Sequence, residues 1–167
     1  AADTLDVDCD RVSDLVVVYA PTESLAVEGK EILEVLVRRA DEWRHALTVA
    51  SNQGLSLHLA SDLSHSGRRD LVLWEGDESA DRPVVFGWRG DRYQQLALPR
   101  DYAITNHDWN ESFHPECAAR LLPALGASDR LLLLRPVPTR PGEGGGCAHM
   151  PTDTLVVRGD SLVDHSN

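Results

Sequence analysis

The chain of 167 residues has few lysines, cysteines and aromatic residues, and it has no long apolar run. Lysine occurs once, and the formal net charge is −11, which argues against a surface that binds nucleic-acid phosphates. The longest apolar runs, Leu15–Tyr19 and Leu131–Leu134, are far shorter than the roughly 18 to 20 residues that span a bilayer. We therefore expect one domain over residues 1–167, with no transmembrane segment and an acidic surface that attracts basic proteins.

Only three cysteines are present. In an oxidising compartment, Cys117 and Cys147 are the natural disulfide pair, closing a loop of about 30 residues and leaving Cys9 unpaired. The chain begins Ala1-Ala2-Asp3 without methionine, as a mature exported protein would, although a shortened chain would begin in the same way. These features predict a periplasmic or secreted protein.

Motifs that carry catalysis are also missing. The sequence has no Gly-x-Ser-x-Gly nucleophile elbow and no glycine-rich phosphate loop that opens a helix. The histidines and cysteines of the second half do not have the spacing of a closed zinc site: His107, His114, Cys117, Cys147 and His149. We therefore predict a protein that is not an enzyme; an enzyme whose site no motif reveals is the third alternative.

Helical patterns are scarce. Residues 115–125 have Pro115 and Glu116 in a first turn, an apolar face and a glycine stop, which predicts at most a short helix. Residues 21–34 are only loosely periodic. The aperiodic segment 102–116 is interpreted as a functional or capping loop.

A nine-residue pattern occurs twice, at 6–14 and 62–70, and each copy leads directly into an apolar strand. A strand, a connection and a β-hairpin follow both copies, so the chain contains repeated units at roughly 6–49 and 62–98, with a weaker one at 129–163. The predicted fold is mainly β, an antiparallel β-sandwich or a propeller-like sheet built from about 2.5 repeated units with little helix. Its tryptophans inside strands are predicted to be core residues: Trp43, Trp74 and Trp88.

Short oxygen-bearing side chains recur at positions 1, 3, 5 and 9 of the pattern, and such side chains can bind Ca²⁺. Position 12 is apolar in both copies, which excludes an EF-hand. The first copy lacks the glycine expected at position 6, where it has Arg11, and the second has Gly67 but only two carboxylates. The alternative is that side chains bonding the backbone hold both loops as turns. The candidate ligands are Asp6, Asp8, Asp10 and Asp14, and more weakly Asp62, Ser64, Ser66 and Asp70.

These loops resemble the Asp-x-Asp-x-Asp-Gly-x-x-Asp sites of integrin-type propeller repeats. The hairpin sequence Arg89-Gly90-Asp91-Arg92-Tyr93 also resembles a known element, because Gly90-x-x-Tyr93 is similar to the Ser-Gly-x-x-Tyr loop with which bacterial periplasmic lysozyme inhibitors enter a glycosidase cleft. The Arg-Gly-Asp within it recurs at 158–160, so ordinary turn chemistry explains that tripeptide.

Together, the loop and the hairpin resemble the periplasmic inhibitors of invertebrate-type lysozyme and related immunity proteins against peptidoglycan-hydrolase effectors. The resemblance covers roughly residues 55–99, with a weaker echo over 6–49. It implies a β-rich inhibitor that occludes the active site of a basic hydrolase through Arg89–Tyr93. The alternative function is a calcium-stabilised β-repeat module for binding or adhesion.

Overall fold

The computed structural model describes residues 2–21, 30–76, 80–100, 102, 104–105, 119–122, 130–134 and 152–165. Within these ranges the chain forms thirteen β-strands and no helix. No helix in the described part of the chain is therefore long and apolar enough to cross a membrane. The prediction of a mainly β fold made of antiparallel sheets is confirmed.

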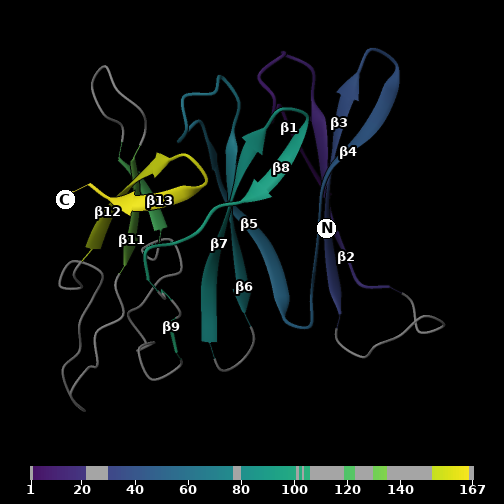
Figure 1. Cartoon of the computed structure of the whole chain (residues 1–167). Helices are drawn as coiled ribbons and strands as arrows, with labels where there is room; N and C mark the ends of the chain where they lie inside the picture. Colours follow the sequence, from purple (N-terminus) through teal and green to yellow (C-terminus); the bar gives the residue numbers. More distant parts are fainter. Residues whose placement is uncertain are drawn as a thin grey trace.

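Three antiparallel sheets follow one another along the described chain (Figure 1); the first and third have four strands, and the second has five. The first sheet contains β1 (Ala2–Leu5), β2 (Asp14–Tyr19), β3 (Glu31–Arg39) and β4 (Glu42–Ser51). The second contains β5 (Gly54–Ser61), β6 (Asp70–Gly76), β7 (Ala80–Arg89) and β8 (Arg92–Gln95), and β9 (Ile104–Thr105) also pairs with β7. The third contains β10 (Ala119–Leu122), β11 (Arg130–Leu134), β12 (Thr152–Arg158) and β13 (Ser161–Asp164).

The four main strands of each sheet form a simple meander, in which each strand pairs with its neighbours in sequence; β9 lies outside this order, since it pairs with β7. In a meander, the connection between strands one and two lies at the same end as the turn between strands three and four. The loops 6–13 and 62–69 therefore lie beside the hairpin turns of their own sheets (Figure 1). We call this end of the three sheets the loop edge.

The strands also correct several sequence-based expectations. Residues 119–122 of the helix predicted at 115–125 form β10, and residues 31–34 belong to β3, because pairing with neighbouring strands decides the conformation of short apolar segments. Each repeated unit begins one strand earlier than predicted, since β1 and β5 precede the acidic loops. The third unit has four strands and is not a half unit.

The sheets pack face to face through two apolar cores. The first core joins β2, β3 and β4 to one face of the second sheet, and it includes Val35, Leu71 and Trp88. The second core joins the opposite face of the second sheet to the third sheet, and it includes Trp74 and Leu155. Residues on β6 alternate between these cores, which explains why the apolar run in this strand is buried on both sides.

We name the two faces of each sheet by this order. The upstream face of the second sheet packs on the first sheet, and its downstream face packs on the third. The same names apply to the equivalent positions of the other sheets. Trp74 and Trp88 are core residues as predicted, whereas Trp43 lies on the upstream face of the first sheet with half of its side chain exposed, so that prediction is wrong.

Candidate functional site

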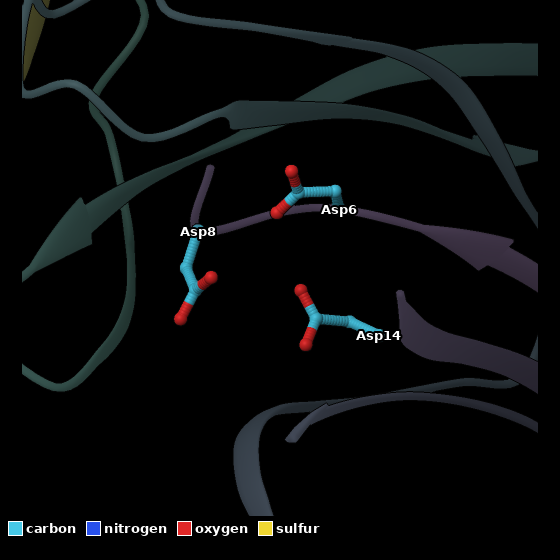
Figure 2. A group of neighbouring side chains, drawn as sticks. All are labelled: Asp6, Asp8 and Asp14. Carbon is cyan, nitrogen blue, oxygen red and sulfur yellow. The ribbon is translucent and has the colours of Figure 1, made fainter. Parts of the chain in front are cut away.

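Three carboxylates of the first acidic loop converge at the loop edge. Asp6, Asp8 and Asp14 each place an oxygen within 4.8 Å of the others, and Figure 2 shows these carboxyl groups gathered around one point. Asp8 and Asp14 are buried. The predicted ligand set is therefore brought together, except that Asp10 is not part of this cluster.

Most of these carboxylate oxygens already accept hydrogen bonds from the backbone. Asp6 accepts from the N–H groups of Asp10 and Arg11, each at 3.1 Å. Asp10 accepts from the N–H of Val12 at 2.8 Å. The Asp10 contact is an Asx turn, and the Asp6 contacts reach four and five residues along the chain; together these side chains satisfy the donors of a loop that has no ladder partners.

Asp14 connects its loop to the hairpin of the same sheet. One oxygen accepts from the N–H of Val7 at 2.8 Å, and the other accepts from the N–H of Arg38 at 2.9 Å. Burial raises the pKa of the Asp14 carboxyl above its ordinary value, although both backbone bonds act in the opposite direction. Both oxygens of Asp14 are thus engaged in holding the loop on the sheet.

Asp8 is held by two guanidinium groups. Its Oδ2 lies 2.7 Å from Arg39 and 3.1 Å from Arg68, and its side chain has no exposed surface. Arg68 comes from the acidic loop of the second sheet and also stacks over Trp88 at 4.9 Å. A buried carboxylate needs a cationic partner, and here two arginines serve that purpose, so the residues around Asp8 do not form a free ligand set for Ca²⁺.

The second acidic loop has a similar hydrogen-bond network, in which Ser64 and Ser66 occupy the positions of Asp8 and Asp10. Asp62 accepts from the N–H groups of Ser66 and Gly67, each at 2.9 Å. Asp70 accepts from the N–H and hydroxyl of Ser64 and from the N–H of Trp88, and burial raises its pKa. The weaker candidate ligands Asp62, Ser64, Ser66 and Asp70 therefore form a turn network that parallels the first loop.

The backbone follows the same course in both loops. Arg11 has φ +71° and Gly67 has φ +74°, and these two residues occupy position 6 of the pattern. Cys9 and His65 at position 4 are also left-handed, with φ +58° and +56°. Arg11 in place of the expected glycine thus leaves the loop conformation unchanged. Cys9 is an exposed free thiol.

The hairpin between β7 and β8 places the proposed target-binding residues in two different environments. Tyr93 is only 6% exposed, packs edge-on against Trp88 and donates its hydroxyl hydrogen to the carbonyl of Arg69 at 2.8 Å. Tyr93 is therefore a core residue that joins the hairpin to the acidic loop, and its side chain is not available to enter a cleft. Gly90, Asp91 and Arg92 are exposed at the turn.

Arg89 has a structural partner on the third sheet. Its Nε lies 3.0 Å from an oxygen of Asp160, and its guanidinium group also donates to the carbonyl of Gly159. The indole N–H of Trp88 donates to the carbonyl of Gly90 at 2.9 Å. These contacts hold the β7–β8 turn of the second sheet against the turn of the third sheet. The exposed residues Gly90, Asp91 and Arg92 therefore lie on a well-supported turn.

The sequence patterns missed the arginines that neutralise the first loop and the exposed Trp43. The only available signal for Arg68 was the Arg-Arg pair within the second acidic loop. The proposed pair Cys117 and Cys147, with most of the segment 102–116, lies outside the described residues; Tyr102 is described, and its buried hydroxyl donates to Asp153.

Comparisons with family models, with curated proteins and with solved structures gave no match for this chain.

Proposed function

We propose that the protein is an exported bacterial inhibitor or immunity protein that binds a basic peptidoglycan hydrolase and covers its active site. The observation that carries this proposal is the rigidly held β7–β8 turn, which exposes Asp91 and Arg92 above a buried Trp88–Tyr93 pair. A turn that is already ordered loses little conformational entropy on binding, which favours affinity.

Arg92 is the group in this turn best suited to a glycosidase cleft. Glycoside hydrolases have two catalytic carboxylates on either side of the scissile bond, and an exposed guanidinium can pair with either of them. The net charge of −11 would speed the approach of a basic enzyme and orient it. Tyr93 contributes by supporting the turn from below, not by contacting the target.

The test is an inhibition assay with purified peptidoglycan and a panel of lysozyme-type hydrolases, including the product of any neighbouring gene. We expect the wild-type chain to inhibit one of them and Arg92→Ala to weaken inhibition at least tenfold, as the loss of a buried interfacial charge pair would. Arg44→Ala is the matched control, because Arg44 is an exposed arginine on the hairpin of the first sheet. Full activity of every hydrolase in excess protein would remove the proposal.

A calcium-stabilised β-repeat module for binding or adhesion is the second candidate. The convergence of Asp6, Asp8 and Asp14 within 4.8 Å favours it. The arginines at Asp8 weigh against it, because they already supply the positive charge that an ion would bring. We therefore place it second.

A further inference from the structure

The upstream face of the first sheet stays exposed in the described chain, although the equivalent faces of the second and third sheets are covered. Its pattern follows from strand register: Leu15 pairs with Leu36 as Leu71 pairs with Phe86 in the second sheet. Leu71 is completely buried against the first sheet, whereas Leu15 and Leu36 are only half-buried.

Two large side chains on this face are unusually exposed. Trp43 is 50% exposed and Tyr19 is 40% exposed. Trp43 pairs with Arg38 in the same way that Tyr93 pairs with Trp88, and Tyr93 is buried by the first sheet. Apolar groups at equivalent positions are thus buried in the second sheet and exposed in the first, as expected of a surface that has a partner.

We infer that the third sheet of a second copy of the chain covers this face. The downstream face of that third sheet would pack on the upstream face of the first sheet, as the downstream face of the second sheet packs on the upstream face of the third within one copy. The interface between consecutive sheets occurs twice in the chain, and a second copy would continue it. Propellers generally contain 4–8 four-stranded blades. The three sheets of the described residues are too few, whereas those of two chains arranged head to tail are enough to close a ring.

Charge complementarity favours the third sheet as the partner surface. Within the chain, Arg89 at the end of β7 pairs with Asp160 in the turn of the next sheet. The equivalent of Arg89 in the third sheet is Arg158, which is exposed, and the equivalent of Asp160 in the first sheet is Asp41, which is also exposed. A second copy in this arrangement would place Arg158 beside the Asp41 of its partner.

The apolar surface of the third sheet agrees with this choice. Val156 and Val163 pair across β12 and β13 on the downstream face, opposite the side that carries Leu155 and Leu162 in the core. Both valines are half-buried, so they offer apolar surface to the first sheet of another copy.

Sedimentation of the intact chain over a range of concentrations tests the inference. We expect a species with twice the chain mass of 18.4 kDa. Trp43→Glu should shift the dimer dissociation constant at least tenfold. The variant should still fold, because Trp43 is half exposed and its one described ring contact is a stacking interaction with Arg38 at 6.0 Å. A chain that stays monomeric at every concentration, or a dimer that is insensitive to Trp43→Glu, would overturn the inference.

Charge reversal separates this arrangement from other dimers. Asp41→Arg and Arg158→Asp should each weaken the dimer, and the double variant should restore it. Asp91→Arg is the matched control, because Asp91 has the same turn position in the second sheet. A dimer in which the double variant gives no rescue would be held by another interface, and polymers heavier than a dimer would show that the ring does not close; either result rejects the proposed pairing.

Discussion

Position 6 of the acidic loops shows how one backbone conformation is achieved by two different residues. Arg11 and Gly67 have almost the same positive φ, although only glycine takes this conformation without steric cost. The first loop therefore keeps its shape because its carboxylates bind the backbone N–H groups around Arg11. The hydrogen bonds therefore specify the loop conformation, and glycine at position 6 only lowers its steric cost.

Exchanging the residues at position 6 should change stability in opposite directions. Gly67→Ala should lower the free energy of unfolding by about 1 kcal/mol, because a Cβ at positive φ is strained. No atom outside the neighbouring residues lies within 4 Å of a Cβ at this position, so backbone strain would be the only cost. Arg11→Gly should raise the free energy of unfolding by up to about 1 kcal/mol.

Urea denaturation measures both effects. Gly90→Ala is a useful companion, because Gly90 also has positive φ and open space around its Cβ. Equal stability of Gly67→Ala and the wild-type chain would show that the loop relaxes away from the left-handed conformation.

In the first two sheets, the aspartate that ends each acidic loop binds the backbone of the hairpin in the same sheet. Asp14 and Asp70 accept from the N–H groups of Arg38 and Trp88, which precede equivalent turns. In the third sheet, the strand register puts Arg130 at the position of these aspartates. The carboxylate anchor thus belongs to the first two sheets in the described chain.

Calcium binding stays a prediction, and the loop geometry gives it a definite expected outcome. Because backbone donors and two arginines already satisfy the carboxylates of the first loop, we expect millimolar Ca²⁺ or EDTA to shift the melting temperature by less than about 2 °C, since an ion that binds the folded state weakly stabilises it little. Differential scanning calorimetry in both conditions measures the shift.

Arg68→Gln supplies the control for this experiment. It removes one guanidinium from Asp8 and should create a freer, more acidic site. An increase of several degrees with Ca²⁺ in the wild-type chain would contradict the expectation and favour the calcium-stabilised module.

At the scale of the whole molecule, the second sheet is the centre of the structure because both of its faces are buried. Backbone bonds add to this packing: Ala97 donates to the carbonyl of Asp160 at 3.0 Å and accepts from the N–H of Leu162 at 2.8 Å. The third sheet is thus joined to the second through its apolar core and through the backbone.

Substitutions in the core and on the uncovered face should differ sharply. Leu162→Ala should lower the free energy of unfolding by about 3 kcal/mol, because Leu162 is 1% exposed in the second core and truncation leaves a cavity. Tyr19→Ala should change it by less than about 0.5 kcal/mol in the monomer, since the side chain lies at an exposed strand end. Both values come from denaturation at a concentration below any self-association. Equal losses in the two variants would mean that the upstream face is packed within one chain.

Much of the architecture could be predicted from local sequence. Apolar runs predicted the strands that follow the two acidic loops, β2 and β6, because such runs can be recognised from the chain alone, whereas β1 was not predicted. The nine-residue repeat identified corresponding loops, and the turn residues located the hairpins at 89–92 and 158–161. Short apolar segments without a repeat, such as Ala119–Leu122, were assigned wrongly because their conformation depends on strand partners.

The sequence by itself determined the repeat, the strands and hairpins that follow each acidic loop, and the net negative charge, because these follow from residue spacing and composition. Only the tertiary structure decided which face of each strand is buried. Trp43 and Tyr93 occupy equivalent hairpin positions. The first sheet covers Tyr93, whereas no sheet of the described chain covers Trp43. The tertiary structure also decided that Arg39 and Arg68, which are distant in sequence, compensate the buried charge of Asp8. Sequence alone could not show this, because the desolvation of a carboxylate depends on which groups the fold packs around it.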